Sequence, residues 1–398
     1  MDIKERLQSR LVRLFERIEL LVTKFHRSYL VLVCLFALIG YAFVLLFPAI
    51  VVFSISNINE ILISEVKIVW LELFTWVFVL LFSAQTSYHL AITKPVPAVG
   101  FTMPESKIPK VYSLVKKLQT HYKRPVIHKI IITANYEMDI VKTPKWMLPV
   151  WSSNTLIIGL PLLICMSPEQ FEHMMARKIG QFSKQTNPLT NWLYQLTGIW
   201  KQYSYIYGKQ KYIESKLLSA FYTAYAAVYE RVSVFAARID ELNADRYAME
   251  LYVHDDIREM ISADAMSRWY LQKRFWPAIE KIANDKTKEP LAPYRKLTSL
   301  VKSNFTNEKI PVLKKYAYRE EPKFNERVPS LKDRLENIGH DKPHMRENKA
   351  QSAAEFYLGA SLNGALNLMD KLWLKNNKKK SAANKSVRNG WVPALKKG

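Results

Sequence analysis

The 398-residue sequence has little cysteine and little glycine, with only Cys34 and Cys165 and eleven glycines. The two cysteines lie in separate regions, which argues against a disulfide framework and suits a reducing compartment. No glycine-rich loop of the phosphate-binding kind occurs, and no known nucleic-acid-binding motif is present. The sequence therefore gives no support to a disulfide-stabilised secreted protein or to a nucleotide-binding enzyme of that type.

Acidic residues are also scarce relative to basic ones. The chain has 58 Lys and Arg against 35 Asp and Glu, which gives a formal net charge of +23. Such an excess favours an anionic partner, either a phospholipid surface or a nucleic acid. The length is enough for one main domain with appendages.

Charge is missing from two long stretches near the N-terminus. Residues 28–59 contain no charged side chain, and residues 68–92 contain one, Glu72. A run of about 20 apolar residues suffices to cross a bilayer. A buried core helix is rarely this long without charge. A signal peptide has a shorter apolar run, and the charged region before it is shorter than this one and does not carry four acids. We predict two transmembrane helices within residues 29–92, with Trp70, Trp76 and Tyr88 as interfacial anchors.

The distribution of basic residues predicts the orientation. Residues 1–28 hold seven Lys and Arg, the loop 56–66 holds none, and five lysines follow the second span by residue 117. By the positive-inside rule, both termini and the main domain lie on the cytoplasmic side of the inner membrane. Apolar residues recur every three or four positions in residues 1–28, which predicts a basic amphipathic juxtamembrane helix. It lies on anionic lipid or packs on the soluble domain.

The remaining sequence predicts an α+β fold that is predominantly helical. Residues 126–134 and 154–163 are short β-branched runs typical of strands. Helical patterns cover residues 108–121, 168–184, 215–252, 257–283 and 350–374. We expect a cytoplasmic domain over residues 100–340, a helical extension over residues 341–374, and a disordered basic tail over residues 375–398. Attraction of that tail to anionic lipid is a simpler account than nucleic-acid binding, and a tail without function is equally tenable.

One helix raises a question of chemistry. Ser167 and Pro168 form a strong helix start, with Gln170 completing a capping box. Apolar residues then mark a buried face, and Lys178 projects near the centre of that face. A lysine in that position is costly unless an acid pairs with it. The alternative is that its ammonium group reaches solvent along a buried stem.

Candidate acids lie about sixty residues further on. Glu241 and Asp245 are four residues apart and share one face of a predicted helix. Taken alone, this pattern favours a solvated face on which Arg238 and Arg246 neutralise the acids.

In combination, these segments resemble the membrane zinc metallopeptidases, the family of the heat-shock protease HtpX and the CAAX prenyl endopeptidases. The segments that carry the resemblance are "SPEQFEHMMARKIGQF" (167–182), "DELNADRYAMEL" (240–251) and "RVPSLKDRLENIG" (327–339), with support from "NTLIIGLPLL" and "SAAEFYLGASL". The resemblance implies a zincin-like peptidase domain with a small sheet, preceded by a transmembrane hairpin.

The resemblance also implies a zinc site that this sequence does not preserve. Members carry H-E-x-x-H, whose two histidines bind zinc and whose glutamate activates water, and a later glutamate is the third ligand. Here Arg177 and Gln181 stand at the histidine positions, Lys178 stands at the base, and Glu241 is retained with Asp245 nearby. Arginine has no lone pair for a metal, and a lysine adds positive charge beside it. We therefore expect no catalytic residue and no bound metal or other cofactor.

The substitutions also make sense as a set. We hypothesise that Arg177 or Lys178 pairs with Glu241, so that a salt bridge replaces the metal and stabilises the fold without catalysis. A relocated zinc site at His340 and His344 is disfavoured, because Gly339 and Pro343 predict a turn there. His173, one turn before Arg177, is expected at the surface.

Three functions remain in view. The first is a membrane-anchored pseudopeptidase that binds a polypeptide as a scaffold or in protein quality control. The second is an active zinc endopeptidase with non-standard ligands, which would need zinc and Glu241. The third is a membrane-tethered polyanion binder that depends on residues 375–398.

Overall fold

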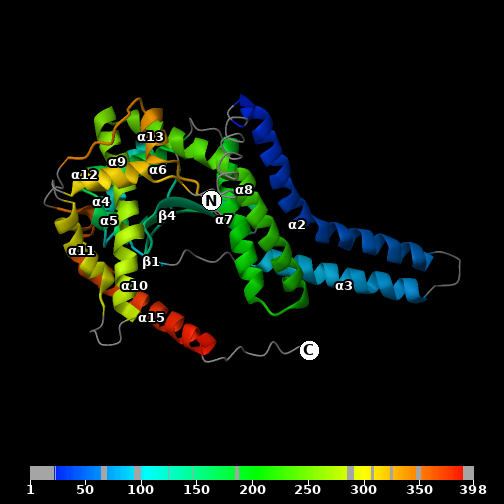
Figure 1. Cartoon of the computed structure of the whole chain (residues 1–398). Helices are drawn as coiled ribbons and strands as arrows, with labels where there is room; N and C mark the ends of the chain where they lie inside the picture. The colour runs from blue at the N-terminus through cyan, green and yellow to red at the C-terminus, as the bar shows by residue number, and fades with distance from the viewer. Residues whose placement is uncertain are drawn as a thin grey trace, which may run out of the picture.

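The computed structural model describes residues 22, 24–63, 70–93, 100–123, 125–146, 148–183, 188–284, 291–305, 309–322, 326–346 and 351–388. It is predominantly helical with one small mixed sheet, which confirms the predicted α+β class. Figure 1 shows a lobe built around the sheet and a helical hairpin that projects from it. The predicted juxtamembrane helix over residues 1–28 lies almost entirely outside the described residues.

The helices follow one another along the whole chain. They are α2 (His26–Ile63), α3 (Trp70–Ile92), α4 (Pro109–Tyr122), α5 (Leu160–Cys165), α6 (Pro168–Gly180), α7 (Pro188–Lys209), α8 (Ile213–Met249), α9 (His254–Tyr270), η1 (Leu271–Phe275), α10 (Trp276–Asn284), α11 (Pro293–Asn304), α12 (Ile310–Arg319), α13 (Leu331–Asn337), α14 (Ala353–Leu358), η2 (Gly359–Ser361) and α15 (Leu362–Arg388).

The sheet has four strands in the order β1-β2-β4-β3. Strands β1 (Gly100–Thr102) and β2 (Lys129–Thr133) are antiparallel, β2 and β4 (Leu148–Gly159) are parallel, and β3 (Met138–Trp146) is antiparallel to β4. The two predicted strands correspond to β2 and β4. The prediction missed β3, an edge strand that contains Pro144, a residue that sheets tolerate mainly at their edges.

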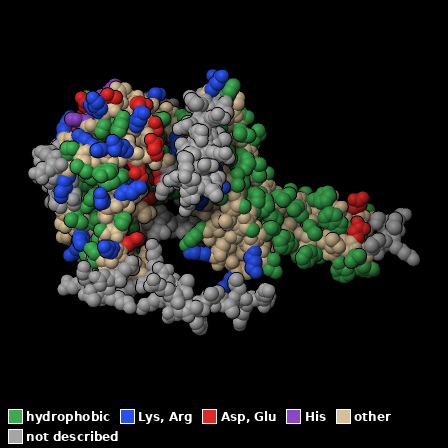
Figure 2. All heavy atoms as spheres, in the orientation of Figure 1, with side chains coloured by type: hydrophobic (Ala, Val, Ile, Leu, Met, Phe, Trp, Pro, Cys, Tyr) green, Lys and Arg blue, Asp and Glu red, His purple; other side chains and the backbone are tan. Residues whose placement is uncertain are grey.

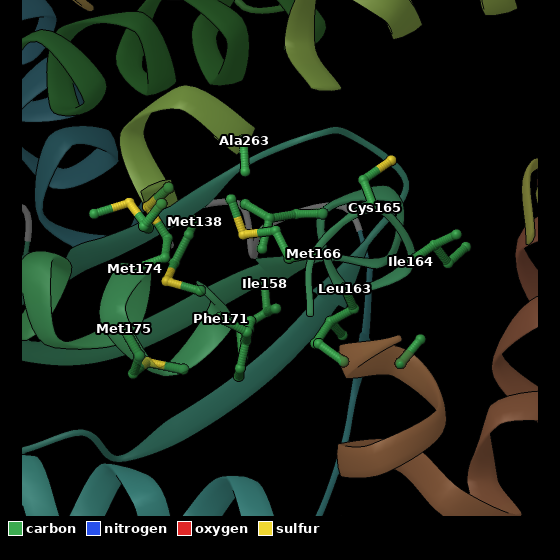
Figure 3. Close-up of a cluster of buried hydrophobic side chains, with 14 of the residues drawn as sticks. Met138, Ile158, Leu163, Ile164, Cys165, Met166, Phe171, Met174, Met175 and Ala263 are labelled. Atoms are coloured by element: carbon green, nitrogen blue, oxygen red, sulfur yellow. The ribbon is translucent and has the colours of Figure 1, made fainter. Parts of the chain in front are cut away.

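Helix α6 packs its apolar side into the core of the lobe. Phe171, Met174, Met175 and Ile179 are all buried, as their spacing predicts. Figure 3 shows Phe171, Met174 and Met175 among buried side chains of the strands and of α5. Each such side chain contributes about 1.5–3 kcal/mol when fully buried, so this face fixes α6 against the sheet.

Two helices of the described chain, α2 and α3, are long and apolar enough to cross a membrane. This confirms the two predicted apolar helices within residues 29–92, except that α2 begins slightly earlier, at His26. Figure 1 shows that α2 bends partway along its length. Pro48 lies inside α2, and a proline ring clashes with the carbonyl four residues earlier, which explains the bend.

The N-terminal half of α2 packs on α7 and α8 through aromatic side chains. Tyr225 stacks on Phe36 and Trp200 contacts Tyr41, with ring centroids 5.7 and 5.0 Å apart. Beyond the bend, α2 pairs with α3, and Figure 2 shows that hydrophobic side chains cover this projecting part. Many apolar residues here are more than half exposed, including Val52 at 69% and Leu71 at 79%. A surface of this kind is suited to lipid rather than to water.

The last part of the chain differs from the prediction in two respects. A single helix was expected over residues 350–374, but Gly359 has a φ of +49° and separates α14 from α15. A disordered tail was expected over residues 375–398, but α15 continues to Arg388, and residues 389–398 lie outside the description. The physical reason is that this segment is rich in Lys, which is a good helix former, and has no Gly or Pro before Gly390.

Candidate functional site

The helix that resembles a zinc helix begins as the sequence predicts. The Ser167 hydroxyl accepts a hydrogen bond from the Gln170 backbone, and the Gln170 side chain accepts one from the Ser167 backbone. This capping box starts α6, and three turns later Arg177 and Lys178 occupy its last turn. Both side chains are buried, with exposed fractions of 4% and 5%.

Lys178 does not reach solvent. Its Nζ lies 3.0 Å from Glu241 Oε1 and 2.9 Å from Gln181 Oε1, and Asp139 Oδ1 is 3.6 Å away. The alternative in which the ammonium group snorkels to water is therefore wrong. The buried lysine has the acid that its position requires.

Arg177 completes the pairing. Its Nη2 donates to a Glu241 carboxylate oxygen and its Nε donates to Asp245 Oδ1 at 2.5 Å. The predicted salt bridge between the substituted helix and Glu241 is confirmed, and it involves both cations. Glu241 and Asp245 are buried rather than solvated, so the interpretation in which Arg238 and Arg246 neutralise an exposed face is wrong.

The ionisation of Glu241 follows from these contacts. Burial by itself would raise the pKa of Glu241, but the charges of Lys178 and Arg177 outweigh it and hold the pKa well below its usual range. Glu241 is therefore a buried carboxylate anion that forms ion pairs with both Arg177 and Lys178.

A second arginine extends the network, and the sequence analysis missed its role. Arg334 on α13 binds Asp245 with two parallel hydrogen bonds of 2.9 and 2.8 Å, and its Nη1 donates to Asp264 at 2.9 Å. Its side chain is 2% exposed. A signal was present in the quoted segment, because Leu331, Arg334 and Leu335 are spaced as one buried helical face.

Asp264 on α9 is the other residue that the sequence analysis did not single out. It is 2% exposed and also lies 3.3 Å from Arg268. Burial acts to raise the pKa of Asp264, but Arg268 and Arg334 outweigh it and lower the pKa. The network thus joins α6, α8, α9 and α13 through charged groups alone.

Gln181 connects this network to one further acid. Its amide nitrogen donates to Asp240 Oδ2 at 2.8 Å, and its amide oxygen accepts from Lys178. Asp240 is the member whose pKa is raised, to about 6, because burial outweighs the hydrogen bond from Gln181.

Asp240 makes stability depend on pH in a definite direction. An acid with a higher pKa in the folded than in the unfolded chain binds protons on folding, so stability falls as pH rises from about 4 to about 6. We expect Asp240→Asn, which keeps an acceptor for Gln181, to raise the free energy of unfolding at about pH 8 by about 1–3 kcal/mol. Urea unfolding in detergent at about pH 8 and about pH 4 measures it. An equal gain at both values would show that the charge is not responsible.

The donor set does not fit a zinc ion. Glu241 already binds two cations, Arg177 offers no lone pair, and the Gln181 amide is a poor neutral donor for zinc. Among the described residues, no group of three His, Cys, Asp or Glu is arranged to hold a metal. The arrangement can hold charge and shape in place through its ion pairs.

The candidate histidines lie away from this network. His340 and His344 lie in a non-helical segment after α13, as predicted. His173, expected at the surface, is buried beside Tyr252 with ring centroids 4.4 Å apart. Its position on the α6 face that packs toward Tyr252 explains the difference.

A groove lies beside the buried network. A cavity of about 210 Å³ is lined by Arg177, Lys178 and Glu241 on one side and by residues 136–139 on the other. Met138 and Met174, labelled in Figure 3, also line it. A smaller hollow of about 50 Å³ continues between β3 and α7, and both spaces are lined by Asp139 and Arg327.

No protein-family model, curated protein or solved structure matches this chain. The resemblance to the zinc metallopeptidases therefore rests on the motifs and their order.

Proposed function

We propose that this protein is a membrane-anchored, non-catalytic relative of the zinc metallopeptidases that binds an extended polypeptide. The motif order supports the resemblance, and the substituted helix supports the loss of chemistry. Arg177 and Lys178 bring two positive charges to Glu241, the same charge that a divalent metal would supply. The network keeps the cleft in shape without a metal or a base.

The edge of the sheet supports binding of an extended chain. Strand β3 is last in the sheet order, so no described strand pairs with its outer edge. The Glu137 carbonyl accepts a hydrogen bond from the Gly159 N–H, so the backbone polar groups of Glu137 point toward β4. In an antiparallel strand, the backbone N–H and C=O of successive residues point alternately toward one neighbour and away from it. Ile140, three residues on, therefore turns its N–H outward, where it donates to Asp139 Oδ1 at 2.9 Å. An added strand could replace this local contact.

The groove between β3 and α7 is the observation that carries the proposal. Gln195 of α7 lines it, and the Gln195 amide nitrogen is buried with no hydrogen-bond partner among the described residues. A buried donor left unsatisfied costs about 1–3 kcal/mol, which a peptide carbonyl would recover. Arg327 and Lys142 add positive charge along the same groove.

Gly198 offers a direct test, because it lines the groove from α7 and a Cβ placed there meets no atom within 4 Å. We expect Gly198→Trp to fill the groove and weaken binding of a disordered polypeptide, such as fluorescently labelled β-casein, at least about tenfold. Fluorescence anisotropy with the full chain in detergent measures the affinity.

Gly198→Ala is the matched control. It keeps the groove open and replaces a glycine in a helix interior, so binding should persist and stability should rise by up to about 1 kcal/mol. Binding should resist a metal chelator, and the probe should remain intact. Equal binding by the tryptophan variant would refute the groove, and chelator-sensitive cleavage would favour the zinc endopeptidase.

The orientation in the membrane is part of the same proposal. We infer that both termini and the lobe lie on the cytoplasmic side of the inner membrane, with basic segments against anionic lipid. The reason is that residues 56–66, between the two apolar stretches, hold no Lys or Arg, whereas residues 1–28 hold seven. Labelling of a cysteine placed at Asn57 by a membrane-impermeant reagent from outside would support it; labelling only after lysis would oppose it.

A further inference from the structure

A second cavity lies in a different part of the lobe. It has a volume of about 400 Å³ and is lined by the end of α9 and by η1, α10, α11 and α12. None of the described residues that line it also lines the groove beside β3. Phe275, Ile279 and Leu313 form a buried apolar floor, with exposed fractions of 2%, 1% and 7%. Val312 and Tyr316 stand exposed at its mouth.

The mouth of this cavity is basic. Arg274, Lys296 and Lys309 line it with exposed side chains, and its described lining includes no acid. The guanidinium of Arg274 lies over the ring of Trp269, 5.8 Å from its centroid, and Trp269 stacks on Tyr316. In Figure 2, Lys and Arg side chains border apolar ones over this side of the lobe. An apolar interior with a cationic rim matches a ligand that has a hydrocarbon body and an anionic head.

The chain is locally irregular where it lines the cavity. A helix was expected over residues 257–283, but η1 (Leu271–Phe275) forms a π-helical turn between α9 and α10. Pro277 explains this turn, since proline cannot donate to the carbonyl four residues earlier. Arg274 and Phe275 both lie in this turn, and such turns are frequent at functional sites.

We propose that this cavity binds one medium-chain fatty acid of about twelve carbons, with the acyl chain on the apolar floor and the carboxylate at Arg274 and Lys296. A group of methylene size takes up about 30 Å³, like a water molecule in the liquid, so the cavity holds roughly a dozen carbons. That is room for one chain but not for a diacyl phospholipid. Affinity then depends on chain length, about fourfold per methylene, which corresponds to ~0.8 kcal/mol.

Photolabelling of the full chain in amphipol tests this site directly. The probe is dodecanoate with a diazirine near its methyl end, and cross-links are mapped by mass spectrometry of peptides. We expect labelling on α10 and α12 that dodecanoate competes away. Decanoate should compete about fifteenfold more weakly, and dodecan-1-ol about tenfold more weakly because it lacks the charge.

Variants on α10 and at the rim separate the two parts of the site. Ala278→Trp should abolish labelling, because Ala278 lines the cavity from an exposed position. Glu280→Trp, on the same helix but outside this lining, should leave labelling unchanged. Arg274→Ala with Lys296→Ala should remove the preference for dodecanoate over dodecan-1-ol. Labelling confined to α2 and α3, labelling that survives Ala278→Trp, or stronger competition by dodecyl phosphate would each overturn the fatty-acid assignment.

Discussion

Replacement of Glu241 by alanine is expected to lower the free energy of unfolding by about 3–5 kcal/mol, because breaking a buried ion pair leaves its cations charged in a dry site. Lys178 would keep its 2.9 Å hydrogen bond to Gln181 and a longer contact of 3.6 Å to Asp139, and Arg177 would keep Asp245. Urea unfolding of the detergent-solubilised chain, followed by tryptophan fluorescence, measures the loss.

A matched surface acid provides the control for Glu241. Glu105 is 57% exposed and pairs with Lys116 at 2.8 Å, so Glu105→Ala should change stability by less than about 1 kcal/mol. Lys178→Met combined with Glu241→Met should lose less than Glu241→Ala, since an apolar pair of similar volume leaves no cation unpaired at this contact. If Glu241→Ala is as stable as the wild type, the salt bridge does not stabilise this fold.

Arg334→Met is expected to lower the free energy of unfolding by a similar amount, about 3–5 kcal/mol. Methionine fills much of the same space but donates no hydrogen bond, so Asp245 and Asp264 lose three contacts of 2.8–2.9 Å. Both carboxylates are at most 2% exposed, so water cannot replace the guanidinium without opening the core.

Arg334→Lys tests whether charge alone is enough. A lysine keeps the positive charge but cannot bind Asp245 through two parallel bonds while also reaching Asp264, so an intermediate loss is expected. Thermal and urea unfolding of the wild type and both variants rank them. Full stability in the methionine variant would mean that the α8, α9 and α13 contacts hold the lobe without this arginine.

Together these losses would identify the network as a structural element of the cleft. It links four helices, and two of its cations come from the helix that resembles a zinc helix. The groove beside β3 lies directly against it. A variant that weakens the network is therefore expected to weaken polypeptide binding as well, whereas Gly198→Trp should block binding without loss of stability.

Features that depend on neighbouring residues were predictable. The capping box at Ser167 and the buried face of α6 follow from spacings of three and four residues, which share one side of a helix. The two candidate membrane helices follow from long runs without charge. The chemistry of a lysine on an apolar face also required an acid, so the presence of a buried acidic partner for Lys178 could be inferred.

Features that depend on residues far apart in the sequence could not be predicted. Lys178 and Glu241 are 63 residues apart, and Asp245 and Arg334 are 89 apart. The pattern of each helix shows which side is buried but not which helix it meets. The sequence offered Arg334 only as part of a motif, and Asp264 not at all.

The sequence by itself therefore determined several of the helices, the cap of α6, the apolar hairpin and the need to neutralise a buried lysine. These are consequences of local periodicity and of the cost of burying charge. Only the tertiary structure decided that Arg177 and Lys178 share Glu241, that Arg334 joins Asp245 to Asp264, and that β3 and α7 border a groove. The reason is that such contacts depend on how four helices and an edge strand pack together, and no short stretch of sequence encodes that packing.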